Sequence, residues 1–118
     1  MITFFGDYIW TPLFGSHFDK HLDFHSLDVR DLDTLDLKAS SAIYNELDNN
    51  GGDFTLLLAH IIGIDSAGHT YNSKSKEIER KLRDSQEVIQ NIIERMDDKT
   101  TLIVFGDHGM TDDGNHGG

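Results

Sequence analysis

The chain has 118 residues, of which 37% are hydrophobic, 21 are acidic and 10 are basic, so its formal net charge is −11. This length corresponds to one domain, and the acidic balance argues against binding to nucleic acid or anionic lipid, because a negative surface repels both. Cysteine is absent, which excludes disulfides, thiolate metal ligands and thiol nucleophiles.

Neither a membrane helix nor a signal peptide is expected in these residues. The longest apolar runs, 54–64 and 102–105, are far shorter than the roughly 20 residues that cross a bilayer. The N-terminus has no basic region ahead of its apolar residues. The chain ends on two glycines directly after a polar cluster, so we expect residues 1–118 to be a fragment of a larger domain.

The first third of the chain predicts one short strand followed by irregular structure. Ile2–Phe5 is an apolar run that ends at Gly6-Asp7, which indicates a short buried strand. Residues 11–27 show no clear period, so we expect a loop or a short helix there. The acidic stretch 28–36 indicates a solvated turn that leads into a helix.

A short helix is expected over residues 39–47. Its Ile43 and Leu47 are four positions apart, so they lie on one face, and we expect that face to point inward. The helix should end at residues 49–52, where two asparagines and two glycines form a strong breaker.

The second half predicts a strand, a long helix and another strand. The apolar run 54–62 is bounded by turn residues, as is typical of a strand buried on both faces of a parallel sheet. From about residue 75 to 96, apolar side chains recur every three, four or seven positions, which predicts an amphipathic helix. The apolar, β-branched run 101–105 predicts the second strand. Together they predict a βαβ unit, and therefore an α/β fold with parallel strands.

Potential metal ligands follow both of these strands, at the ends where open α/β sheets form their sites. Asp65 and His69 are four residues apart after the first strand, and Asp107 and His108 are adjacent after the second, with His116 eight residues further on. Asp and His suit zinc or manganese where no thiolate is available. Each pair alone is also typical of a surface or a capped turn, but their position on neighbouring strand ends favours a metal site.

Glycines accompany these ligands, and the remaining histidines lie elsewhere. The glycines permit positive φ and close approach of the backbone to an ion or a phosphate; they are at positions 63, 68, 106, 109, 114, 117 and 118. We expect His60 to be buried, or to contact the metal ligands without binding the metal itself. We expect His17, His21 and His25 to be surface residues.

Several motifs resemble the alkaline-phosphatase superfamily, and within it the GPI ethanolamine phosphate transferases. They are Gly-x-Asp-x-x-Gly-His at 63–69, Gly-Asp-His-Gly-Met-Thr at 106–111 and Asn-His-Gly-Gly at 115–118. The segment 6–14, with Gly-Asp-x-x-Trp followed by Leu-Phe, is similar to that family's Gly-Asp-Asp-Thr-Trp…Leu-Phe-Pro stretch. The stretch 28–36 resembles the one typical of the enzymes that modify the third mannose.

The resemblance implies a partial alkaline-phosphatase-like α/β sandwich, with residues 1–118 as a fragment of its catalytic domain. It implies that Asp65, His69 and His116 are ligands of one zinc ion, and that Asp107 and His108 are two ligands of a second. Zinc is the implied cofactor, and manganese is an alternative.

The implied reaction is the transfer of phosphoethanolamine from phosphatidylethanolamine to a mannose of the GPI-anchor precursor. It would take place on the lumenal side of the endoplasmic reticulum membrane, with the family's membrane segments and a stabilising membrane subunit as the implied partners. In the family, the Thr or Ser nucleophile and the remaining carboxylate ligand lie upstream of Gly6, and nothing in residues 1–5 replaces them. We therefore expect no activity from this chain alone. The alternatives are a truncated, inactive relic with residual metal binding, and a related phosphodiesterase.

Overall fold

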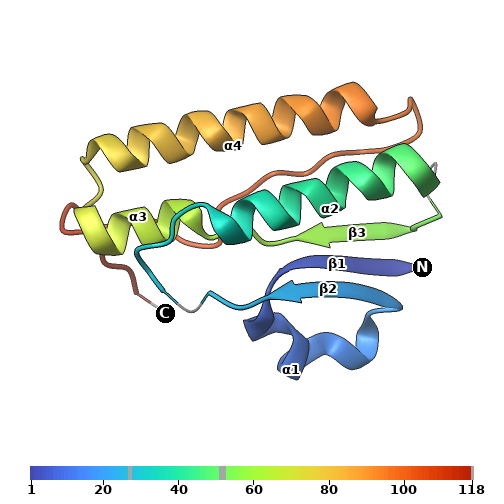
Figure 1. The fold of residues 1–118 in the computed structure, drawn as a ribbon, viewed down its shortest axis with the longest axis horizontal. Helices are drawn as coiled ribbons and strands as arrows, with labels where there is room; N and C mark the ends of the chain where they lie inside the picture. Colours follow the sequence, from blue (N-terminus) through green and yellow to red (C-terminus); the bar gives the residue numbers. More distant parts are fainter. Residues whose placement is uncertain (27, 51–52, 118) are drawn as a thin grey trace.

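The computed structural model describes residues 1–26, 28–50 and 53–117. Its centre is a parallel three-stranded sheet in the order β2-β1-β3 (Figure 1). The strands are β1 (Ile2–Asp7), β2 (Lys20–Phe24) and β3 (Leu56–Ala59). The α/β fold with parallel strands is therefore confirmed.

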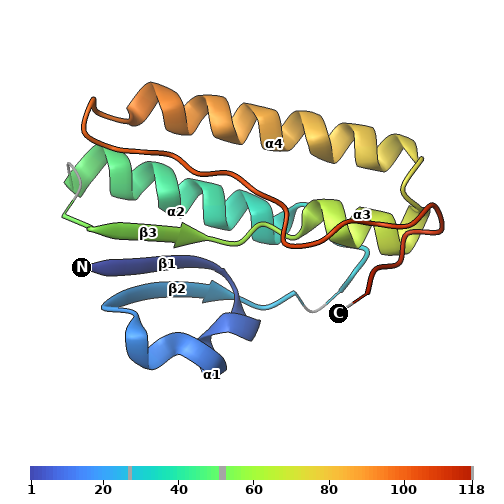
Figure 2. The same cartoon turned by 180° about the vertical axis from the view of Figure 1, so that it is seen from behind.

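Helices connect the strands and lie beside the sheet (Figures 1 and 2). Between β1 and β2 lie the short helix α1 (Thr11–Phe14) and two 3-10 turns, Tyr8–Trp10 and Gly15–His17. Helix α2 (Thr34–Asn50) packs against β1 and β2. Helices α3 (Gly63–Tyr71) and α4 (Lys76–Arg95) follow β3, and α4 packs against α2 and α3. No helix in the described ranges has the length and apolar character needed to cross a bilayer.

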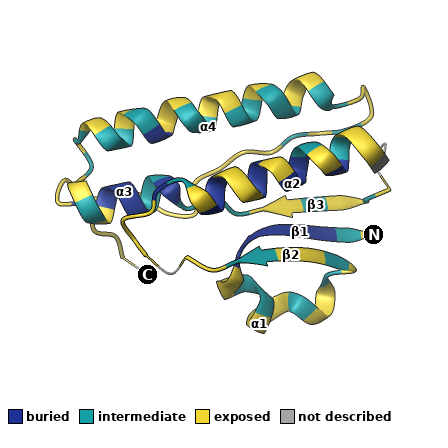
Figure 3. Cartoon of the chain, in the orientation of Figure 1, coloured by how far each residue is buried: buried dark blue, intermediate teal, exposed yellow. Residues whose placement is uncertain are grey.

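Strand β1 is the best buried part of the molecule (Figure 3). It is buried from Thr3 to Asp7, because it is the central strand and α2 covers one of its faces. The side chain of Phe5 packs there with Ala42 and Ile43 of α2, and Leu47 packs against the same cluster. The predicted strand and the inward orientation of Ile43 and Leu47 are thus confirmed.

Helix α2 begins earlier than the predicted 39–47. Its first turn starts at Thr34, whose backbone N–H donates to the Asp31 carboxylate at 3.0 Å. Such a side-chain acceptor satisfies one of the free N–H groups at a helix start. The acidic turn does lead into a helix, as expected, but its last residue, Asp36, is buried rather than solvated. Of the predicted breaker 49–52, residues 51–52 lie outside the described residues.

Strand β2 was not predicted. Residues 11–27 do contain short helices, but Lys20–Phe24 forms an edge strand in parallel register with Thr3–Asp7. Its sequence, Lys-His-Leu-Asp-Phe, is mostly polar, and within the described residues one of its edges has no neighbouring strand. An edge strand of this kind gives only a weak hydrophobic signal.

The long amphipathic helix is confirmed as α4. It begins after Ser75, whose hydroxyl oxygen accepts a hydrogen bond from the Ile78 backbone at 3.3 Å. The segment that carries Asp65 and His69 forms helix α3, for which the sequence analysis predicts no element.

The predicted strand 101–105 is wrong, and so is the βαβ unit built on it. These residues form no strand, and Ile103 and Phe105 are 77% and 81% exposed. The strand predicted over 54–62 is also shorter, at Leu56–Ala59, and partly exposed rather than buried on both faces. The helical crossover between two strands is made by α2, which connects β2 to β3. The physical reason is that 101–105 has no neighbouring strand within the described residues to pair with.

Candidate metal centre

Three of the five predicted ligands, Asp65, His69 and His116, form a compact cluster. Their candidate donor atoms all lie within 4.8 Å of one another. The Asp65 Oδ1 atom is 3.4 Å from Nε2 of His69 and 3.3 Å from Nε2 of His116. This oxygen is shielded from solvent and accepts no hydrogen bond from the described residues. A carboxylate oxygen facing two imidazole nitrogens is a donor set that fits zinc or manganese.

The remaining two predicted ligands lie beside this cluster. His108 Nε2 is 3.9 Å from Asp65 Oδ1, and its ring stacks on His116 with centroids 3.7 Å apart. Asp107 Oδ1 is 3.7 Å from His108 Nε2, and the Asp107 side chain is largely exposed. The structure therefore brings all five residues together from three segments: α3, residues 107–108 and the loop before residue 117.

The spacing along α3 explains how its two ligands meet. Asp65 and His69 are four residues apart in one helix, so their side chains lie one above the other on the same face. The start of this helix is fixed by a carboxylate from α2: Asp36 Oδ1 accepts hydrogen bonds from the backbones of Ile62 at 3.0 Å and Gly63 at 3.2 Å. Asp36 thus orients the helix that carries the ligands.

Asp36 belongs to an ion network that sequence reasoning missed. Its Oδ2 atom is 2.8 Å from Nζ of Lys81, and both side chains are at least nine-tenths buried. Next to it, Arg80 of α4 donates to Asp33 at 2.8 Å, and this hydrogen bond holds the Asp33 pKa below its usual value. One signal was available in the sequence. Lys81 lies three positions after Ile78 on α4, so it faces inward, and a buried lysine requires a carboxylate partner.

Two glycines of α3 allow close packing around the centre. A Cβ atom on Gly63 would lie 2.2 Å from both the Asp36 carboxylate and the Lys81 side chain. A Cβ atom on Gly68 would lie 2.1 Å from the sulfur of Met110. No larger residue fits at either position without displacing the groups that surround the ligands.

A tight turn places His116 against α3. The backbone N–H of Thr111 donates to the Asn115 carbonyl at 2.8 Å, and Gly114 has a φ of 85°. This left-handed conformation strains any residue with a side chain, and a Cβ atom on Gly114 would also lie 2.0 Å from the Gly68 carbonyl oxygen. Gly106, Gly109 and Gly117 have no such close contact, and Gly118 lies outside the described residues.

The other histidines lie apart from the cluster. His17, His21 and His25 are exposed, as predicted. His60 is half-buried, and its ring contacts Trp10 edge-on with centroids 5.5 Å apart. Its Nδ1 atom is buried and finds no hydrogen-bond partner among the described residues.

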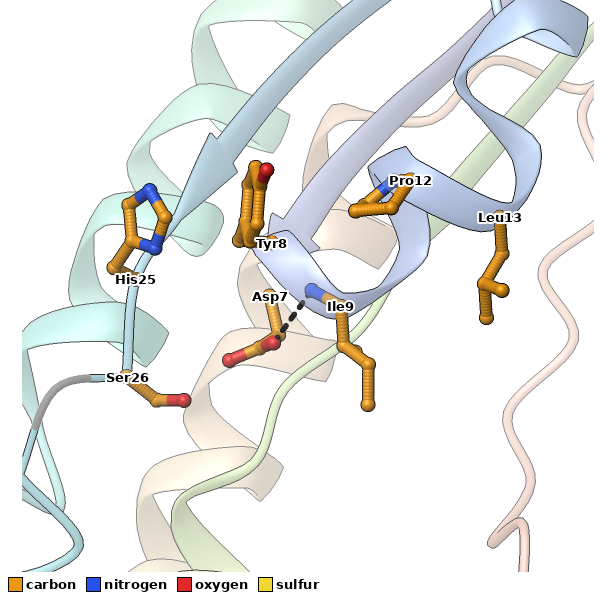
Figure 4. A pocket seen from close by; sticks show the side chains of 7 residues that line it. All are labelled: Asp7, Tyr8, Ile9, Pro12, Leu13, His25 and Ser26. Atoms are coloured by element: carbon orange, nitrogen blue, oxygen red, sulfur yellow. Dashed lines mark hydrogen bonds between the residues drawn. The ribbon is translucent and has the colours of Figure 1, made fainter.

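A separate hollow lies at the carboxyl ends of β1 and β2 (Figure 4). Its volume is about 440 Å³, and the rings of Tyr8 and His25 in its wall are 4.2 Å apart. The Asp7 carboxylate accepts a hydrogen bond from the Ile9 backbone at 2.8 Å, which starts the 3-10 turn that follows β1. None of the five clustered residues lines this hollow.

Comparison with known proteins identifies the family. Residues 6–116 match the family of type I phosphodiesterases and nucleotide pyrophosphatases. Over 117 residues, which are 99% of the chain, it is 41% identical to the catalytic subunit of human GPI ethanolamine phosphate transferase 3 and 42% identical to that of the mouse. A GPI ethanolamine phosphate transferase 2 from Eremothecium gossypii is 38% identical over 118 residues.

The chain covers only a small part of these relatives. It spans 11% of the human protein, 10% of the mouse protein and 14% of the Eremothecium protein. No solved structure matches it. The length of the family match shows that the chain belongs to the type I phosphodiesterase and nucleotide pyrophosphatase family.

Proposed function

We propose that this chain is the metal-binding part of a GPI ethanolamine phosphate transferase and acts in GPI-anchor biosynthesis. The observation that carries the proposal is the convergence of three imidazoles, from His69, His108 and His116, on Asp65 Oδ1, with Asp107 beside His108. Relatives with that activity, matched over 99% of the chain, support the choice of substrate.

In this proposal the ligands divide into two sets. Asp65, His69 and His116 hold one ion, and Asp107 with His108 contribute to a second; zinc is the expected metal and manganese the alternative. When bound, such a pair of ions activates a hydroxyl nucleophile and stabilises the negative charge that develops on phosphorus. The ligands, for their part, fix the position of the reacting phosphate, and Asp36 keeps α3 in place beneath two of them.

The proposed reaction proceeds in two displacements. A Thr or Ser hydroxyl outside these 118 residues attacks the phosphorus of phosphatidylethanolamine, and diacylglycerol leaves. A mannose hydroxyl of the GPI precursor then attacks the same phosphorus and releases the nucleophile. Both steps take place on the lumenal side of the endoplasmic reticulum membrane, where membrane segments of the longer polypeptide and a stabilising membrane subunit are the expected partners.

The test is an Asp65→Asn substitution in the full-length enzyme. It removes the charge of the central carboxylate with little change in shape, so we expect bound zinc to fall. Transfer of labelled phosphoethanolamine to the GPI precursor should fall by at least about 100-fold, the upper range for residues that merely support metal ligands. The matched control is His21→Gln, because His21 is exposed on β2 outside the cluster. Unchanged zinc content and activity in the Asp65 variant would contradict the proposal.

Hydrolysis is the second candidate, favoured by the family match to phosphodiesterases. It requires the same metal ligands but water as the acceptor. Supplying the full-length enzyme with labelled phosphatidylethanolamine, with and without GPI precursor, separates the two. A transferase puts the label on the precursor, whereas a phosphodiesterase releases free phosphoethanolamine at the same rate in both reactions.

A further inference from the structure

The hollow at the carboxyl ends of β1 and β2 contains a buried carboxylate with one unpartnered oxygen (Figure 4). Asp7 is 8% exposed, and its Oδ1 atom accepts the hydrogen bond from the Ile9 backbone. Its Oδ2 atom is also shielded from solvent, yet it has no hydrogen-bond partner among the described residues. Because a buried polar atom without a partner costs free energy, this oxygen points to a donor that the described residues do not supply.

The two other buried carboxylates of the described chain each pair with a lysine. Asp36 is 2.8 Å from Nζ of Lys81, and Glu46 forms an ion pair with Lys20. Asp7 is buried to the same extent as Asp36, 8% against 7% exposed, but no basic side chain in residues 1–26, 28–50 or 53–117 lies within ion-pair distance of it. A buried carboxylate is normally paired with a positive charge, so the missing partner of Asp7 is expected to be a cation.

The residues around Asp7 suit an organic cation better than a metal ion. Asp7 and His25 are the metal-ligand types in the wall, and neither belongs to a group of three potential ligands in the described chain. The Tyr8 ring lies beside the His25 ring, and the face of a tyrosine ring attracts a cation. In Figure 4 the free oxygen of Asp7 points toward the hydroxyl group of Ser26, which is a further acceptor.

The rim of the hollow is apolar and open to solvent. Ile9 and Leu13 line it and are 60% and 67% exposed. The volume of about 440 Å³ is within the range of small-molecule sites, roughly 300–1000 Å³. It exceeds what an ammonium group alone would fill, so the cation is expected to be one end of a larger molecule whose carbon skeleton contacts this rim.

We propose that this hollow binds a primary ammonium group of a substrate. One N–H of the ammonium donates to Asp7 Oδ2, a second donates to the Ser26 hydroxyl oxygen, and the Tyr8 ring lies against the charge. The hollow and α3, which follows β3, are at the carboxyl edge of one parallel sheet, where open α/β sheets bind their ligands. In naming a substrate as the ligand, the inference rests on the proposed function; the two candidate carriers are the phosphatidylethanolamine headgroup and an amino group of the acceptor.

Binding of ethanolamine to the zinc-loaded, full-length protein tests the proposal, with ethylene glycol as a neutral probe of similar size. In a ligand-observed NMR titration, ethanolamine should bind at least about 10-fold more tightly, which is the effect of a hydrogen bond between charged groups. Asp7→Asn should remove this preference, because it keeps an oxygen for the Ile9 backbone but loses the charge. Equal binding of the two probes to the wild type, or an unchanged preference in Asp7→Asn, would overturn the proposal.

The matched control for this variant is Asp19→Asn. Asp19 is exposed, and its carboxylate also accepts a hydrogen bond from a backbone N–H, that of Ile2 at 2.7 Å. Its variant should therefore bind ethanolamine as the wild type does. Loss of the preference in both variants would show that the total negative charge attracts ethanolamine, and it would overturn the assignment to the hollow.

A third variant separates the hollow from the metal centre, because an amine can also bind zinc. Asp65→Asn should lower the zinc content and leave the preference for ethanolamine intact. The ammonium site and the proposed metal centre can therefore fail independently of each other. Loss of the preference in Asp65→Asn but not in Asp7→Asn would place the amine on the metal and overturn the proposal.

The transfer reaction identifies the molecule that carries the ammonium. Asp7→Asn should raise the KM of one substrate at least about 10-fold and change kcat much less, because the ammonium is bound before and during the reaction. A higher KM for phosphatidylethanolamine would identify the donor headgroup, and a higher KM for the GPI precursor would identify an amino group of the acceptor. Unchanged KM values for both substrates would contradict the assignment of the ligand as a substrate.

Discussion

The two ends of the described chain contain similar apolar runs, but one run is buried and the other is exposed to solvent. Phe5, in the apolar start of β1, is 1% exposed, whereas Phe105, in the apolar run 101–105, is 81% exposed. The first run has β2, β3 and α2 around it, and the second has no strand beside it among the described residues. Apolar composition therefore marks a segment for burial, but the burial itself depends on a partner that the sequence of the segment does not specify.

The candidate metal centre contains residues from both the packed part and the exposed part of the molecule. Asp65 and His69 are on α3, which the buried ion network attaches to the packed half of the molecule. Asp107, His108 and His116 are on the exposed C-terminal segment, which contacts α3 at Gly68 and Gly114. Asp65 and His69, the core half of the centre, are thus held by the packed core. Asp107, His108 and His116, its C-terminal half, are held by the turn at residues 111–115.

The largest loss of stability is expected when the contact that attaches α3 to the core is removed. Asp36→Ala removes the closest partner of buried Lys81 and the acceptor at the start of α3, so we expect a loss of about 3 kcal/mol in the free energy of unfolding. Asp98→Ala is the control, because Asp98 is exposed and should change stability by less than about 0.5 kcal/mol. Chemical denaturation of both variants measures the difference. Equal stabilities would show that the Asp36–Lys81 pair does not anchor α3.

A smaller loss of stability is expected when the turn that holds the C-terminal half of the centre is disturbed. Gly114→Ala forces a side chain into a left-handed conformation and against the Gly68 carbonyl, so we expect a cost of about 1–3 kcal/mol and weaker zinc binding. Gly109→Ala is the matched control, since a Cβ atom there meets nothing within 4 Å. Zinc titration of the two variants checks this. Similar zinc affinities would mean that the turn does not position His116.

The smallest change in stability is expected for the partly exposed ion pair between Arg80 and Asp33. Arg80 lowers the pKa of Asp33, so the pair stabilises the protein above the usual Asp pKa of about 4, and this stabilisation is lost as the pH falls through the lowered pKa. Because the Asp33 side chain is 47% exposed, we expect only about 0.5 kcal/mol. Asp33→Asn should lower Tm slightly at pH 7 and by less at pH 2, whereas an equal shift at both pH values would rule out a charge effect.

The sequence predicts those parts of the fold whose signal is local. The period of α4 and the apolar run of β1 indicate helix and strand directly, and both are present. Strand β2 escapes prediction because most of its residues are polar and it lies at the edge of the described sheet. The run 101–105 has the right composition for a strand, but no strand lies beside it within the described residues.

The same distinction holds for the candidate site. Asp65 and His69 are expected together because they are four residues apart, and the rule that sites form at strand ends points to residues 107–108 as well. The stacking of His108 on His116 depends on the turn at Gly114, which spacing alone does not specify. The Asp36–Lys81 pair joins positions 45 residues apart (36 to 81), so only the folded chain reveals that α3 is anchored from α2 and α4.

The most direct test of the metal centre is an anomalous-difference map recorded at the zinc edge from crystals of the zinc-loaded, full-length protein. We predict a peak about 2.0–2.2 Å from Asp65, His69 and His116, and a second peak beside Asp107 and His108. An Asp65→Asn crystal should lose the first peak. A wild-type map with no peak at these residues, or with zinc bound only elsewhere, would contradict the assignment of this cluster as the metal centre.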